Sequence, residues 1–158
     1  MTLYLLIKTL HVIGATLLFG TGAGIAFFML MAHRSGDARA IAHTASVVVI
    51  ADTLFTATAA ILQPVTGAWL AHTVGFPLAH SWLGLSLILY GVTGLFWLPV
   101  VWMQLRMRDL ARIAARDGAP LPPEYHRLWR RWFAFGFPAF FSVLAIIWLM
   151  VSKPNIPL

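Results

Sequence analysis

Ionisable side chains inside apolar sequence are the first candidates for chemistry in this chain. Lys8 and His11 lie three residues apart in the segment LLIKTLHVIGATLLFG, so a helix places both on one face. Asp52 lies in the middle of a second apolar stretch. Burying charge in lipid is costly, so such residues are functional candidates by default.

The histidines predict axial ligation of a haem iron. A hydrocarbon core takes about 20 helical residues, and counting outward from Met31 places His11 near the outer edge of that core. His72 ends the second apolar stretch and His80 opens the third, at about the same depth. Two neutral imidazoles from different helices can hold haem b between them. The preferred pair of iron ligands is His11 with His80, and His72 is the substitute.

Small residues are expected where a flat macrocycle contacts the backbone. Glycines lie on the His11 face of the first helix and the His80 face of the third: Gly14, Gly22, Gly84, Gly91 and Gly94. The alternative role for such glycines is close helix packing, for which Gly20-x3-Gly24 is a typical pattern. Lys8 is the candidate partner of a haem propionate or a substrate anion.

A polar stripe follows Asp52 along the second apolar stretch. It consists of Asp52, Thr56, Gln63 and Thr66. At a regular helical period these residues fall within about 80° of one another, so the stripe should face the bundle interior. It could relay protons or hold a propionate or substrate. Interhelical hydrogen bonding, at about 0.6 kcal/mol a bond, is the alternative, and both interpretations stay open.

Other kinds of site are few. His33, His43 and His126 are expected to be solvated, with a second site of His33 and His43 on the cytoplasmic side as the alternative. The chain has no cysteine, which excludes disulfides, thiolate metal sites and iron–sulfur clusters. Nucleophile elbows, phosphate loops and His-Glu-x-x-His are absent, so hydrolases and kinases are excluded.

Composition indicates the elements that must position these residues. Of 158 residues 60% are hydrophobic and 10% charged, which excludes an ordinary soluble domain and intrinsic disorder. Four apolar stretches can each span a bilayer, at about 3–31, 41–71, 81–103 and 132–151. Backbone groups in lipid must bond internally, so these stretches are helices. We predict an all-α, single-domain, integral membrane four-helix bundle over residues 1–158. Its second helix is kinked at Gln63-Pro64.

The basic residues predict the orientation. Nine of the eleven Lys and Arg lie between the first two stretches or between the last two. The positive-inside rule makes both regions cytoplasmic and puts both termini on the outer, periplasmic side. The cytoplasmic loop is expected at 104–131, and its part 105–117 is expected to extend the third helix.

The distribution of these charges argues against nucleic acid as a partner and for a lipid bilayer. The net charge of +6 is explained by topology, so nucleic acid is not expected as a partner. The expected location is the bacterial inner membrane, as a multi-pass protein in the lipid bilayer. Tryptophans near the predicted boundaries fit an aromatic belt: Trp69, Trp82, Trp102, Trp129 and Trp132.

The first segment resembles the first helix of HemJ-type membrane protoporphyrinogen IX oxidases. There a Lys-x-x-His pair opens the helix and a second His closes it, and Lys8, His11 and His33 occupy these places. The last segment, RRWFAFGFPAFFSVLAIIWLMVSKP, resembles that family's last helix, with a central Pro and a closing Lys-Pro. The resemblance implies haem b on His11. In the third helix, Gly84 and Ser86 stand where that family has His and Lys, which implies altered chemistry.

Over essentially its whole length the chain resembles a group of bacterial predicted integral membrane proteins, classed as a domain of unknown function. We therefore expect a haem-binding membrane protein with an electron-transfer or oxidoreductase role, linked to quinone, a redox protein or porphyrin. A homodimer through small-residue faces is a candidate assembly. The alternative functions are a small transporter and a structural partner of a larger membrane complex, both without cofactor.

Overall fold

Helices make up almost all of the computed structural model, which describes residues 2–78 and 81–156. They are α1 (Thr2–Ser35), α2 (Ala38–Ala51), the π-helix η1 (Asp52–Ala57), α3 (Thr58–Thr73), α4 (Ser81–Asp117) and α5 (Pro123–Ser152). The segments α2, η1 and α3 form one continuous rod, so four helical rods are long and apolar enough to cross a membrane. The prediction of an all-α four-helix membrane protein is confirmed, and no strand occurs in the described ranges.

The region 104–131, predicted as a loop with a helical part at 105–117, is also helical from residue 123, which was not expected. Only residues 118–122 separate α4 from α5. Gly118 ends α4 with φ +62°, a conformation that a glycine adopts without strain. Pro123 begins α5 at the first helical position, where its missing N–H costs nothing. The expected extension of the third helix through 105–117 is confirmed.

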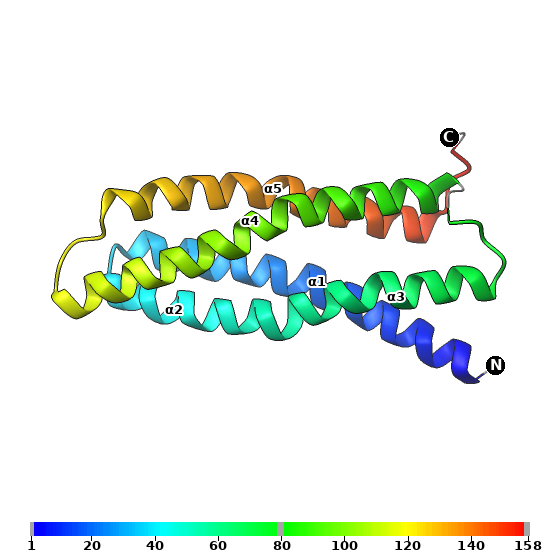
Figure 1. Cartoon of the computed structure of the whole chain (residues 1–158), viewed down its shortest axis with the longest axis horizontal. Helices are drawn as coiled ribbons and strands as arrows, with labels where there is room; N and C mark the ends of the chain where they lie inside the picture. Colours follow the sequence, from blue (N-terminus) through cyan, green and yellow to red (C-terminus); the bar gives the residue numbers. More distant parts are fainter. Residues whose placement is uncertain (1, 79–80, 157–158) are drawn as a thin grey trace.

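The two ends of the bundle differ. We call the end with the loops 36–37 and 118–122 the arginine end and the end with both chain termini the terminal end (Figure 1). At the arginine end α1, α2, α4 and α5 share one core, to which each contributes a fully buried side chain: Met29, Ile41, Met107 and Tyr125. This close packing fixes the arginine end as a closed four-helix unit.

Towards the terminal end the bundle separates into two helix pairs. α3 packs on α1 and α4 packs on α5, while the start of α1 runs away from α5 (Figure 1). The core shared by the four helices contains no residue from α3. Several buried residues of this half are small or polar, among them Gln63, Thr66, Ser86 and Ser142.

One contact ties the second rod to α4 near mid-length. Pro64 has no N–H, so the carbonyl of Ala60, four residues earlier, has no partner within its own helix. The Tyr90 hydroxyl of α4 donates to this carbonyl. Since lipid offers no alternative donor, Tyr90 makes Pro64 tolerable in the helix.

Candidate functional site

His11 is the centre of the polar contacts between α1 and α3. Its Nδ1 lies 2.8 Å from Oγ1 of Thr66. One turn earlier on α3, Nε2 of Gln63 donates to the His11 carbonyl oxygen at 2.7 Å. The two helices approach closely here, because a Cβ on Gly67 would lie 3.1 Å from Cε1 of His11. The imidazole is therefore held at a defined place on α3.

The contacts of Thr66 determine which nitrogen of His11 carries the proton. The Thr66 hydroxyl has one hydrogen, and it points to the carbonyl of Leu62 at 2.7 Å. Thr66 Oγ1 is thus the acceptor and His11 Nδ1–H the donor. The neutral ring then keeps its lone pair on Nε2, which has no hydrogen-bond partner among the described residues.

Two glycines near His11, Gly14 and Gly67, allow α1 and α3 to pack closely. A Cβ on Gly14 would overlap Nε2 of Gln63, so this glycine makes room for the interhelical amide rather than for a macrocycle. A Cβ on Gly22, Gly91 or Gly94 would meet nothing within 4 Å. The predicted macrocycle contact of Gly14 therefore does not fit, because Gln63 occupies the space beside this glycine. Gly22, Gly91 and Gly94, which were predicted to contact the macrocycle too, border open space.

The other predicted haem residues lie apart from this centre or outside the described residues. Lys8 is exposed one turn before His11, with Nζ 5.9 Å from the centre of the Tyr4 ring. His72 is exposed near the end of α3. His80, the preferred second ligand, lies outside the described residues. Within the described ranges no group of three or more His, Asp or Glu is placed to hold a metal ion.

The polar stripe is buried as predicted, but it does not form one face. Asp52, Thr56, Gln63 and Thr66 are each at most 9% exposed. Trp97 of α4 donates to Asp52 Oδ1 at 3.4 Å, whereas Gln63 and Thr66 contact His11 of α1. A π-helical segment turns less per residue than an α-helix, and over its length it offsets the next helix by about 100°. The π-helix η1 therefore directs Asp52 and Thr66 to different neighbours.

Thr56 is the one residue of this stripe left without a partner. Its Oγ1 is buried, and no hydrogen bond satisfies it in the described structure. It belongs to the π-helix between Asp52 and Gln63. Buried polar atoms are normally paired, so this one is a candidate contact for a small polar ligand.

A cluster at the arginine end was missed by the sequence analysis. His33 stacks on Trp129 with ring centres 4.1 Å apart and 14° between the planes. The His126 ring centre is 6.0 Å from that of His33, edge to face. Tyr125 completes the cluster, with its hydroxyl 3.4 Å from His33 Nδ1. The end of α1 meets the start of α5 through tertiary packing, so no local sequence signal could have found this cluster.

His43 is exposed on α2, as expected for a solvated histidine, and the histidine beside His33 is His126 rather than the alternative partner His43. The aromatic belt expected at this end is wrong in part. Trp129 and Trp132 are 8% and 4% exposed, so they belong to the core and not to an aromatic belt. Trp102, 61% exposed, has the outward position that the belt requires.

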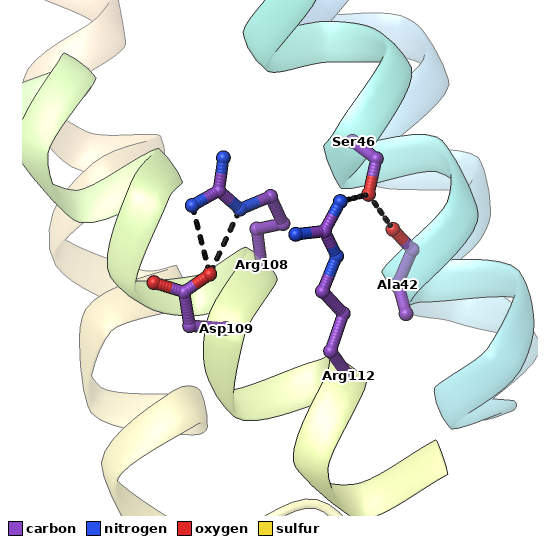
Figure 2. A network of polar contacts seen from close by, with 5 residues as sticks. All are labelled: Ala42, Ser46, Arg108, Asp109 and Arg112. Atoms are coloured by element: carbon purple, nitrogen blue, oxygen red, sulfur yellow. Dashed lines mark hydrogen bonds and ion pairs between the residues drawn. The ribbon is translucent and has the colours of Figure 1, made fainter. Parts of the chain in front are cut away.

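Arg112 of α4 connects this helix to α2, while Arg108 pairs within α4 (Figure 2). Arg112 donates to Ser46 Oγ at 2.9 Å, and Ser46 in turn donates to the carbonyl of Ala42 at 2.6 Å. Arg108 pairs with its neighbour Asp109 at 2.8 Å. These contacts lie on the surface and strengthen the closed arginine end.

The fold agrees with the comparison against known families. A family model described as predicted integral membrane protein (DUF2269) matches residues 5–154. The chain belongs to this family. The match includes every helical rod of the structure, so the description as an integral membrane protein applies to the whole four-helix unit. Neither a curated protein nor a solved structure gives a significant match.

Proposed function

We propose that this DUF2269 protein binds haem b through His11 and serves electron transfer or oxidoreduction in the membrane. The observation that carries the proposal is the unpartnered Nε2 of His11, whose ring is fixed through Nδ1–H by Thr66. Histidines that bind metals commonly donate their other nitrogen in this way, which fixes the tautomer and raises the basicity of the ligating nitrogen. The resemblance of the first helix to HemJ-type oxidases points in the same direction.

The residues present fit one side of a haem. His11 would supply a neutral imidazole, and the exposed ammonium of Lys8, on the same helix face, would pair with a propionate or an anionic substrate. When bound, the haem would supply a one-electron redox centre, whose potential its ligands and burial tune. The chain's own part is to orient His11 and exclude water from it.

The second axial ligand and the redox partner belong to the proposal. His80 is the preferred second ligand and His72 the substitute, because the apolar stretches of the sequence predict both at about the membrane depth of His11. A membrane quinone or a redox protein would exchange electrons with the site. The proposed location is the bacterial inner membrane, with the terminal end facing the periplasm.

An optical spectrum of the purified protein tests the proposal. The protein is isolated in mild detergent, reconstituted with haemin and titrated by absorbance. We expect a Soret band that shifts on reduction and is lost in His11→Ala. His43→Ala is the matched control, because it removes an exposed histidine from the neighbouring rod and should leave the spectrum unchanged.

Two results contradict the proposal. One is the absence of a Soret band in both the isolated and the reconstituted protein. The other is a His11→Ala spectrum equal to that of the unchanged protein, because another residue would then hold the iron. Comparing His72→Ala with His80→Ala identifies the second ligand.

The buried carboxyl of Asp52 beside the Thr56 hydroxyl supports a second candidate function, the passage of a proton or small cation. Asp52, Thr56 and Gln63 would supply the polar atoms along the second rod, all buried at mid-length. Flux into vesicles that contain the protein measures this function. Asp52→Asn should abolish the flux and leave any haem spectrum intact. Flux that is unchanged in Asp52→Asn would exclude this candidate.

A further inference from the structure

The histidine pair at the arginine end has the features of a metal site that is independent of His11. His33 comes from the end of α1 and His126 from the start of α5, and their ring centres are 6.0 Å apart. His33 is half-buried and His126 is exposed, so an ion from solution can reach the pair. The pair lies at the opposite end of α1 from His11.

The surroundings of His33 leave one of its nitrogens free. Nδ1 lies 3.4 Å from the hydroxyl of the fully buried Tyr125. Stacking on Trp129, with 14° between the planes, holds the ring in its plane. Nε2 is therefore the nitrogen available to an ion. Pre-organisation of this kind reduces the entropy lost on binding.

The spacing of the two rings suits a shared ion. A metal–imidazole bond is about 2.0–2.1 Å long, and the ring centre lies about 1 Å behind its nitrogen. Two imidazoles on one ion thus have centres at most about 6.2 Å apart, when the two nitrogens face each other across the ion. The observed 6.0 Å falls inside this limit, and His126 is exposed, so rotation of its side chain can turn a nitrogen towards a shared ion.

We propose that His33 and His126 form a two-imidazole site for a divalent transition-metal ion of the copper, nickel and zinc group. Imidazole nitrogens suit these ions, and Cu²⁺ binds such ligands most tightly. Water occupies the other coordination positions. Exposed Arg34 and Arg127 follow the two histidines in sequence, and their positive charge lowers the affinity for a cation.

The ion would link α1 to α5 across the arginine end. A ligand that binds only the folded protein stabilises it in proportion to the logarithm of its concentration over Kd. Cu²⁺ should therefore raise the Tm of the protein, and the rise should disappear when either histidine is removed.

The experiment is a Cu²⁺ titration of the full chain, purified without a polyhistidine tag and without haem. Calorimetry measures the Kd, and electron paramagnetic resonance counts the nitrogen ligands. We expect one site with two nitrogens. His33→Ala and His126→Ala should each weaken binding at least about tenfold, because a single imidazole remains. His43→Ala and His72→Ala are controls that keep the pair intact.

Three results would overturn this proposal. They are the absence of Cu²⁺ binding, a single-nitrogen signal, and unchanged affinity in His126→Ala. His126 is exposed, so its replacement leaves the fold in place even if His33→Ala destabilises it. The haem spectra of His33→Ala and His126→Ala show whether the copper site is independent of His11. Loss of copper binding with an unchanged haem spectrum supports a separate copper site. Loss of the haem spectrum in His11→Ala with copper binding retained supports it as well.

Discussion

At the scale of single residues, the chemistry of His11 depends on a neutral neighbour. Thr66 uses its one hydrogen for the Leu62 carbonyl and offers its oxygen to His11 Nδ1. A neutral threonine, and not a carboxylate, therefore holds Nδ1–H and leaves Nε2 free. This arrangement suits a site inside lipid, because an unpaired carboxylate would be costly there. Thr66 is thus a positioning residue.

Replacing Thr66 tests this dependence. Thr66→Val keeps the shape of the side chain but removes the acceptor, so His11 loses its tautomer and orientation. We expect haem affinity to fall by about 10–100-fold, the usual effect of losing such a partner. Thr66→Ser keeps the hydroxyl and should bind almost as the unchanged protein. Haemin titration by absorbance measures both, and equal affinities in Val and Ser variants would remove Thr66 from the site.

The close approach of α1 to α3 gives a second residue-scale prediction. Gly14→Ala places a methyl group on Nε2 of Gln63 and should break the bond from Gln63 to the His11 carbonyl. The expected cost is about 1–3 kcal/mol. Gly20→Ala is the control on the same helix, because nothing lies within 4 Å of its Cβ. Unfolding of both variants in detergent is the measurement, and equal stability would contradict the contact.

At the scale of helices, the second rod owes its shape to two interruptions. Pro64 frees the Ala60 carbonyl, which Tyr90 satisfies from α4. The π-helix η1 rotates α3 relative to α2, so that Gln63 and Thr66 face α1 while Asp52 faces Trp97. Pro64 thus joins the rod to α4 through Tyr90, and η1 turns the polar residues of α3 towards α1.

The Tyr90–Pro64 relation predicts a non-additive pair of substitutions. Tyr90→Phe leaves the Ala60 carbonyl unpaired and should cost about 0.6–2 kcal/mol. In a Pro64→Ala background the N–H of residue 64 can bond to that carbonyl, so the same substitution should cost less. A double-mutant cycle from detergent unfolding gives the coupling. Additive effects would show that Tyr90 does not serve the carbonyl freed by Pro64.

The π-helix predicts the effect of a one-residue deletion. Removing Thr53, which is exposed, should convert η1 to an α-helix and rotate α3 by about 100°. Gln63 and Thr66 would leave α1, so haem binding should be lost and the Tm lowered. Thr53→Ala keeps the length of the chain and should change neither. A deletion variant that retains haem would mean that the rotation does not set the site.

At the scale of the whole molecule, the two ends suit different tasks. The arginine end is a closed core of four helices with His33 and His126 at its surface. The terminal end consists of two helix pairs, with His11 held in one of them. A closed end and a more open end thus place the two histidine centres at opposite ends of one bundle.

The orientation of the molecule can be measured directly because the chain has no cysteine. Single cysteines at exposed Ala119 and Asn155 report the arginine end and the terminal end. A membrane-impermeant maleimide on intact spheroplasts should label Asn155→Cys only, and both after lysis, since the positive-inside rule predicts that the arginine end faces the cytoplasm. Labelling of Ala119→Cys before lysis would reverse the orientation.

Much of the molecule could be predicted from local sequence. The four spans, the burial of Asp52 and Gln63, and the helical extension through 105–117 follow from hydropathy and helical period. The site could be predicted only as far as His11. Its link to Thr66 joins residues 55 positions apart, and the pairing of His33 with His126 joins residues 93 apart, by subtraction of their numbers. No local pattern contains such pairs.

The sequence by itself determined the class of protein and its four apolar helices. A bilayer admits a long apolar segment only if its backbone groups bond within it, and this condition depends on each segment alone. Tertiary structure alone decided which nitrogen of His11 is free, which neighbour each residue of the polar stripe meets, and which histidines lie together. These features depend on the offset of a π-helix and on contacts between helices distant in sequence.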